Sequence, residues 1–225
     1  MNRMEPLAPV TPVLGSCGAD ALLLDFVMPG VIHSLGNSLF AVQGIAHVLG
    51  AGRQTARQRE TILEACQRAE QALDVLRHLG PLENDPPRSE QAGLLLMRMR
   101  EVCRVPLRER GMRLEIAHSS KDSPRRVDVR TMTRGLIEVL RCIALEVQAG
   151  FEGELTVDLC TQEKANVALD LWLRTDPGYL PFPVAMSAAR AHSEGVLSAM
   201  GASVECWDRD RLRILIPAAA REPRR

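Results

Sequence analysis

The sequence predicts an α+β protein in which an N-terminal antiparallel helical hairpin is followed by an α/β sandwich. Apolar residues recur at steps of three and four in two stretches before residue 80, which is typical of amphipathic helices. Beyond residue 90, similar stretches are interspersed with short segments of alternating apolar and polar residues, which is typical of strands. With 225 residues, 46% of them hydrophobic, the chain can bury a sizeable core.

Residues 1–19 form a Pro-containing segment that we expect to be a flexible leader. From residue 20 to about residue 50 the spacing predicts one long amphipathic helix. Its apolar positions are Leu24, Val27, Val31, Leu35, Leu39, Val42, Ile45 and Leu49.

The segment GAGRQTAR predicts a turn, and a second helical stretch follows it and ends near residue 80. The two helices of residues 20–80 would therefore form a hairpin. One hairpin exposes too much apolar surface to be stable alone, whereas two copies can bury it in a four-helix bundle. We therefore expect a homodimer. The apolar positions of the second helix are Ile62, Cys66, Ala69, Leu73, Leu76 and Leu79.

The Pro-rich and charged stretch GPLENDPPRSE, residues 80–90, predicts a domain boundary. The second domain, residues 90–218, should be a mixed sheet with its helices packed on one face. The first of these helices should be interrupted or end near Pro106. The expected order is a helix at 90–110, a strand at 112–119, a helix at 130–149, strands at 154–161 and 166–175, a helix at 184–201, and strands at 202–208 and 212–217.

Composition excludes several classes of partner. Lys plus Arg and Asp plus Glu are equal at 28 each, so no net charge attracts the chain to nucleic acid or to an anionic membrane. The first 20 residues lack the apolar core of a signal peptide, and no apolar run of membrane-spanning length is evident. We therefore expect a cytoplasmic protein with no nucleic-acid and no membrane partner.

The six cysteines form no CxxC pair and no cluster at metal-ligand spacing. We expect neither a metal site nor a disulfide framework, and we interpret the cysteines as small buried hydrophobes.

His33 and Asn37 lie four residues apart in the first helix and therefore share one face. A neutral imidazole has an unprotonated ring nitrogen that can attack phosphorus and form a labile phosphoramidate. The residues alone leave open that His33 is a structural histidine and that Asn37 is a solvated helix residue.

The segment His33-Ser34-Leu35-Gly36-Asn37-Ser38-Leu39 resembles the H-box of histidine kinases, which reads His, acid, Leu, any residue, Asn, Pro, Leu. The resemblance implies that His33 accepts a phosphoryl group in a dimerising hairpin. Ser34 replaces the acid that acts as a general base during autophosphorylation from ATP, and Ser38 replaces the proline. The missing acid weakens the kinase interpretation more than the phosphotransfer interpretation.

The second domain resembles the ATP-binding domain of the same kinases in the order of its elements. The resemblance places Glu138 and Cys142 where the family has the asparagines of its magnesium-binding helix, and a thiol is a poor ligand for magnesium. Asp176 and Gly178 match an Asp-x-Gly motif for adenine, although Pro177-Gly178 also favours a simple turn. Only YLPFP separates Gly178 from the next predicted helix, so the Gly-rich lid is missing.

These features predict a degenerate nucleotide domain with no cofactor of its own. We expect a histidine phosphotransferase that exchanges phosphoryl groups with response-regulator receiver domains, which supply the Mg²⁺. Geometry would do most of the catalysis, by placing His33 in line with the aspartyl phosphate. Two alternatives remain: a histidine kinase with an atypical nucleotide site, and a non-catalytic dimeric scaffold or inhibitor.

Overall fold

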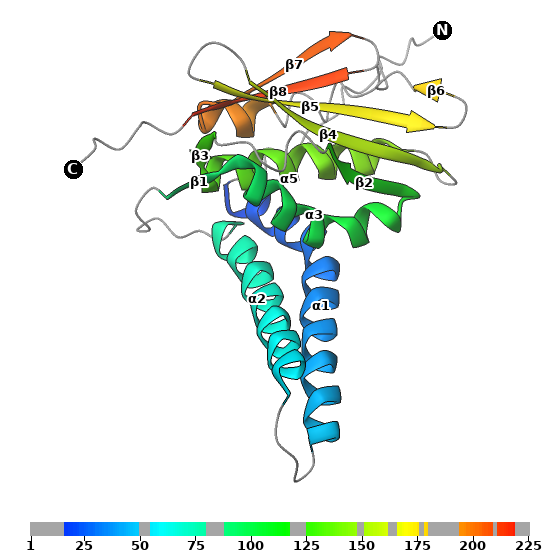
Figure 1. Ribbon diagram of the computed structural model, residues 1–225. Helices are drawn as coiled ribbons and strands as arrows, with labels where there is room; N and C mark the ends of the chain where they lie inside the picture. The colour runs from blue at the N-terminus through cyan, green and yellow to red at the C-terminus, as the bar shows by residue number, and fades with distance from the viewer. Residues whose placement is uncertain are drawn as a thin grey trace, which may run out of the picture.

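The computed structural model describes residues 16–49, 55–79, 88–117, 125–147, 151–161, 166–175, 178–179, 194–208 and 211–218. It has a helical hairpin at one end and a sheet at the other, with a layer of helices between them (Figure 1). The predicted hairpin followed by an α/β sandwich is confirmed.

The hairpin consists of α1, Ser16–Leu49, and α2, Ala56–Leu79. Helix α1 begins four residues earlier than predicted, within the segment expected to be a leader. Helix α2 begins with a capping box, because the amide of Thr55 donates to Gln58 Oε1 at 2.9 Å and the amide of Gln58 donates to Thr55 Oγ1 at 3.3 Å. This reciprocal pair fixes the start of α2.

The second domain contains α3, Ala92–Arg108, and α5, Val129–Glu146, beneath a mixed sheet (Figure 1). The strands are β2, Met112–Ile116, β4, Gly153–Thr161, β5, Asn166–Thr175, β7, Ser203–Asp208, and β8, Arg211–Pro217, in the order β2-β4-β5-β8-β7. Strand β2 runs parallel to β4, and the other neighbours are antiparallel. Strand β6, Gly178–Tyr179, pairs with the end of β5. The predicted mixed sheet with helices on one face is confirmed.

One feature of this domain was not predicted. Strands β1, Ser89–Gln91, and β3, Arg126–Asp128, form a separate antiparallel pair. Helix α3 ends at Arg108, near Pro106 as expected, and it runs through the proline without interruption. Of the helix predicted at 184–201, the structure describes residues 194–199, and these are helical.

One hydrophobic core joins the hairpin to the second domain. Leu23, Val27 and Val31 of α1 are buried in the same cluster as the inner faces of α3, α5 and the sheet, and so are three residues of α2. The α2 residues are Ala72, Val75 and Leu79. The shared core holds the α/β domain in one position on the base of the hairpin.

Ion pairs strengthen the same junction. Asp74 of α2 lies 3.4 Å from Arg98 of α3 and 3.3 Å from Arg88, which precedes β1. Arg134 of α5 pairs with Asp20 of α1 and donates to the carbonyl of Leu79 at 3.1 Å. The hairpin and the α/β domain are therefore linked by polar as well as apolar contacts.

The cysteines differ in burial. Cys103 and Cys142 are buried as predicted, and burial raises the pKa of Cys103 to about 12, which makes it an unreactive thiol. Cys160 is half-buried, and burial together with its hydrogen bond to Asp170 raises its pKa to about 11. Cys66 is exposed, so the prediction is wrong for this residue, which lies on the outer face of α2.

Residues Asp20–Val48 of α1 are long and apolar enough, by length and composition, to cross a membrane. This corrects the expectation that no run reaches such a length. A core helix of a soluble protein meets the same criteria, and Leu23, Val27 and Val31 of this segment are buried against other helices. Length and composition therefore do not decide between a membrane and a protein environment, and the cytoplasmic location stays a prediction.

Candidate functional site

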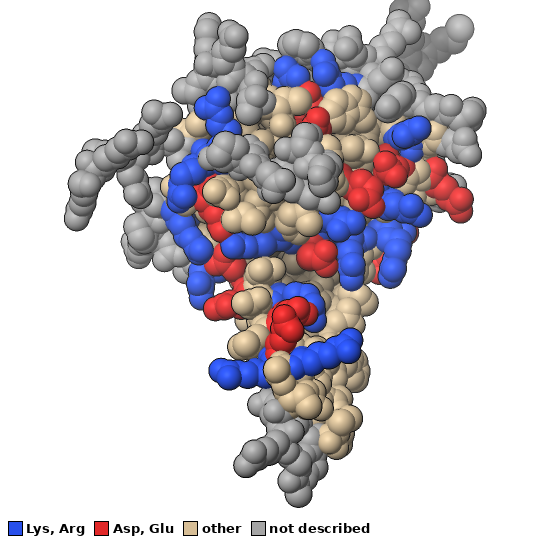
Figure 2. Space-filling model, viewed as in Figure 1, with Lys and Arg blue, Asp and Glu red and all other residues tan. Residues whose placement is uncertain are grey.

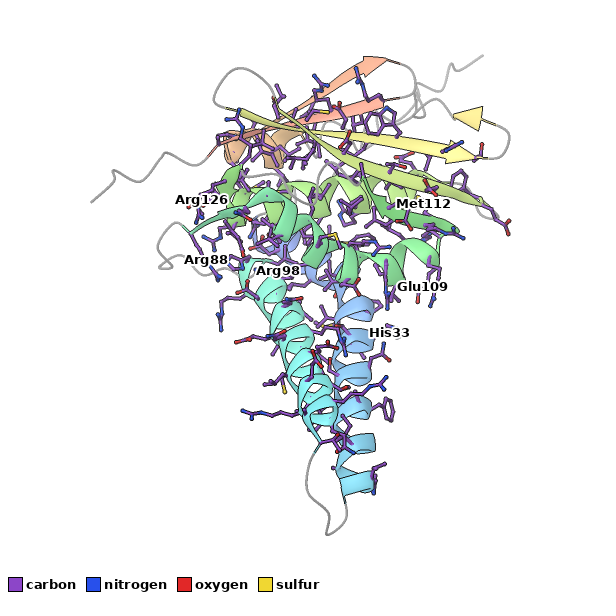
Figure 3. The ribbon with its side chains drawn as sticks, viewed as in Figure 1. His33, Arg88, Arg98, Glu109, Met112 and Arg126 are labelled. Carbon is purple, nitrogen blue, oxygen red and sulfur yellow. The ribbon has the colours of Figure 1, made fainter. Side chains whose placement is uncertain are left out.

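His33 lies on an exposed part of α1, one turn beyond the point where this helix crosses α3. The crossing is at Gly30, whose backbone contacts the carbonyl of Val102 so closely that a Cβ there would lie 1.7 Å from the carbonyl oxygen. Figure 3 shows His33 on the part of α1 just below the end of α3 that carries Glu109. The imidazole is therefore presented to solvent beside the junction of the two domains.

Asn37 holds the imidazole in one orientation. Its amide Nδ2 lies 3.0 Å from Nε2 of His33, as the i, i+4 spacing on a helix allows. An amide N–H can only donate, so Nε2 accepts and the neutral ring carries its proton on Nδ1. The hydrogen bond occupies the single lone pair of Nε2, so the Asn37 amide must move off this nitrogen before it can attack phosphorus.

The apolar residues around His33 divide between the core and the surface. Val31 is buried, and Leu35 packs partly against the core. Ile32 is 63% exposed and Leu39 66% exposed. The exposed pair flanks the histidine and is available to a second molecule.

Ser34 and Ser38, the two positions that depart from the H-box pattern, interact with each other. The hydroxyl of Ser38 donates to the carbonyl of Ser34 at 3.0 Å, and Ser38 is buried. Helix α1 is continuous through this position, where the family pattern has a proline. No Asp or Glu in the described part of the chain forms a hydrogen bond or ion pair with His33, whose side-chain partner there is Asn37.

We predict that Asn37→Ala slows phosphoryl transfer to His33 without removing it. The variant loses one donor that orients the ring and that can bond to a phosphoryl oxygen once the group is on Nε2. A hydrogen bond to a charged group is worth about 1.5–3 kcal/mol, which corresponds to a roughly 10- to 100-fold slower reaction. Single-turnover labelling with a phosphorylated receiver measures the rate, and a wild-type rate in the variant would remove the orienting role.

Glu138 and Cys142, the positions matched to the magnesium-binding helix, are already engaged within α5. Both are buried, with Glu138 only 1% exposed. Arg141 donates to Glu138 Oε1 at 2.7 Å and to Oε2 at 3.0 Å, and the thiol of Cys142 donates to Oε1 at 3.3 Å. The hydrogen bond to Glu138 raises the pKa of Arg141 above its usual range, against the lowering effect of burial.

This ion pair places a guanidinium on the carboxylate that a metal ion would need. No group of three or more His, Cys, Asp or Glu side chains in the described ranges could hold a metal ion. Sequence reasoning missed Arg141, although its i, i+3 spacing from Glu138 is a recognisable signal.

The remaining predicted positions are only partly placed. Gly178 pairs with Thr175 through strand β6. Asp176 and the segment predicted to lack a lid lie outside the described residues. His47 is exposed, and His78 donates from Nδ1 to the carbonyl of Asp74 at 2.7 Å, which fits a structural histidine.

No protein-family model and no curated protein match the chain. Solved structures with a similar arrangement include the histidine kinase AdeS of Acinetobacter baumannii, with 14% identity over 84% of this chain and 98% of that one and a TM-score of 0.42. A bacterial phosphotransferase has 16% identity over 92% of this chain and 98% of that one, with a TM-score of 0.39. The histidine kinase ThkA in complex with the response regulator protein TrrA has 13% identity over 87% of this chain and 62% of that one, with a TM-score of 0.41. At these values the similarity assigns neither a family nor an activity to the chain.

Proposed function

We propose that this chain is a histidine phosphotransferase of a two-component phosphorelay, and that His33 shuttles a phosphoryl group between receiver aspartates. The observation that carries the proposal is the exposed imidazole of His33, with the Asn37 amide 3.0 Å from its Nε2 and able to move onto a phosphoryl oxygen. The H-box pattern of residues 33–39 supports it independently. Transfer from a phosphorylated receiver to His33 is the direct test.

In the proposed reaction, the Asn37 amide moves off Nε2, and the freed lone pair attacks the phosphorus of an aspartyl phosphate on the receiver. A P–N bond forms while the P–O bond to the aspartate breaks, and the aspartate leaves as a carboxylate with the bonding electrons. The Nδ1 proton stays on the ring or passes to water. The same steps in reverse deliver the group to a second receiver, whose Mg²⁺ neutralises the transferring charge.

The interior of the α/β domain supports an external phosphoryl donor. The Glu138–Arg141 pair is incompatible with a magnesium ligand at that carboxylate. The shared core and the Asp74 and Arg134 contacts hold the domain on the hairpin, so a donor bound inside it could not approach His33 freely. Both observations favour a phosphotransferase over a histidine kinase.

We predict that millimolar ATP with Mg²⁺ leaves the thermal midpoint unchanged. A ligand that binds only the folded state must raise the midpoint, and at 100 times its Kd it adds about 2.7 kcal/mol. A thermal melt with and without nucleotide measures this, and Mg²⁺ alone is the control. A clear upward shift would contradict the prediction and favour the kinase alternative.

We also predict a homodimer formed through the hairpin. Both helices expose large apolar side chains that a second copy would cover. Leu39→Lys combined with Phe40→Lys should give a monomer in sedimentation at micromolar concentration, whereas Leu94→Lys, a change at an exposed leucine of α3 outside the hairpin, should remain dimeric. A folded wild-type monomer under these conditions would remove the claim. The exposed apolar residues of the hairpin are Met28, Ile32, Leu39, Phe40, Val48, Leu63 and Leu73.

A further inference from the structure

A basic groove lies between the second half of α3, the edge strand β2 and the adjoining ends of β4 and β5. Its volume is about 1010 Å³. Figure 2 shows Lys and Arg side chains gathered on this side of the molecule above the hairpin, with Asp and Glu side chains among them. Its basic lining residues are Arg100, Arg104, Arg108, Arg113 and Arg174.

Two of the arginines that line the groove form ion pairs, and two others do not. Arg100 lies 3.3 Å from Glu115, and Arg104 lies 3.7 Å from Glu101. Arg108 and Arg113 are exposed and make no ion pair or hydrogen bond with other residues in the part of the chain that the structure describes. A guanidinium presents a planar fork of donors that suits carboxylate and phosphate oxygens.

The turn that joins these arginines is fixed. Gly111 has φ of 76°, and a Cβ there would lie 1.6 Å from the carbonyl oxygen of Phe151. The carbonyl of Gly111 also accepts from the amide of Gly153 at 3.0 Å. Arg108 and Arg113 therefore project from a rigid frame, which lowers the entropy cost of binding.

The groove and His33 lie on neighbouring parts of the structure. Helix α3 contacts α1 at Gly30, and His33 is three residues further along α1, a rise of about 4.5 Å. A folded domain of about 100 residues has a radius of gyration of about 13 Å. A single domain docked over His33 is therefore large enough to reach the C-terminal end of α3 (Figure 3).

We infer that Arg108 and Arg113 bind an acidic patch on the receiver domain that docks at His33, an inference that rests on the proposed function. The groove is lined by both basic and acidic side chains, which favours a protein over a small polyanion as its ligand. Glu115, Glu152 and Glu154 line the same groove and would repel a free polyphosphate, whereas a protein surface can present both signs of charge.

The test uses the full chain and a panel of purified receiver domains phosphorylated with acetyl phosphate. Arg108→Glu and Arg113→Glu should each raise the Kd for the receiver that labels wild type by about 10-fold or more, because like charges then meet. The transfer rate at saturating receiver should change less than about threefold, since neither residue touches the reacting atoms. The affinity of wild type should also fall with added salt more steeply than that of the variants.

Arg110→Glu is the matched control, because it makes the same charge change in the same turn outside the groove lining. Arg108→Lys keeps the charge but loses the planar fork, so its Kd should lie between those of wild type and Arg108→Glu. Unchanged Kd values in both Glu variants, or an equal loss in Arg110→Glu, would overturn the docking inference while leaving transfer to His33 intact. His33→Ala should bind the receiver normally but fail to be labelled. Labelling therefore tests the proposed function, and the Kd values of the arginine variants test the docking inference.

Discussion

His33→Ala should abolish labelling of the chain by a phosphorylated receiver. The imidazole is the nucleophile in the proposed reaction, and alanine offers no lone pair in its place. Folding should be nearly unaffected, because His33 is exposed on α1 and alanine has the higher helix propensity. The measurement is the acid-labile phosphate on the chain after mixing with labelled receiver, with circular dichroism and sedimentation as checks of fold.

His47→Ala is the matched control, since His47 is also exposed on α1 but lacks an asparagine partner. This variant should be labelled like wild type. Suppose instead that His33→Ala is labelled as well, or that no receiver labels wild type. The phosphotransferase proposal would then fail, and the scaffold or inhibitor alternative would take its place.

The order of helices and strands could be predicted from the sequence because each longer element has its own apolar period. The three-residue strands β1 and β3 are too short to show a period, so only their pairing in space identifies them. The capping box at Thr55 and Gln58 is, by contrast, a local signal that the residues themselves contain.

The local sequence did not decide whether α3 is interrupted at Pro106. Proline lacks an N–H, so the carbonyl of Val102 loses its partner within the helix. In the folded chain Gly30 of α1 approaches this same carbonyl. The Gly30 Cα lies within about 3.3 Å of the oxygen, because a Cα–Cβ bond is about 1.5 Å long, and this separation suits a Cα–H···O contact. The contact that compensates for the lost hydrogen bond comes from a helix distant in the sequence. It therefore cannot be recognised from the residues around Pro106.

The candidate site, too, could be predicted only in part from the sequence. His33 and Asn37 share a helix, so their spacing alone predicts that they meet, and the 3.0 Å contact agrees. Which neighbours of His33 face the core depends on how α1 packs against α2 and α3, and the sequence does not contain that information locally. The groove likewise needs α3 and β2 side by side, although Arg100, Arg104 and Arg108 already form a stripe at i, i+4 spacing.

Gly30→Ala and Gly30→Leu should destabilise the fold, although both residues have a higher helix propensity than glycine. The added Cβ would meet the Val102 carbonyl oxygen at 1.7 Å, and a backbone atom cannot rotate away, so α1 and α3 must separate. Overpacking of this kind costs about 1–3 kcal/mol, and we expect leucine to reach or exceed the upper value. The free energy of unfolding from urea titration measures the effect.

Gly36→Ala and Gly44→Ala provide controls on the same helix, because a Cβ at either position meets nothing within 4 Å. These variants should gain up to about 1 kcal/mol from the better helix propensity of alanine. The opposite sign at Gly30 is the distinguishing result, since propensity alone would stabilise all three alanine variants equally. Equal stabilisation would mean that α1 does not pack against Val102 in solution, and the placement of the α/β domain beside His33 would lose this contact.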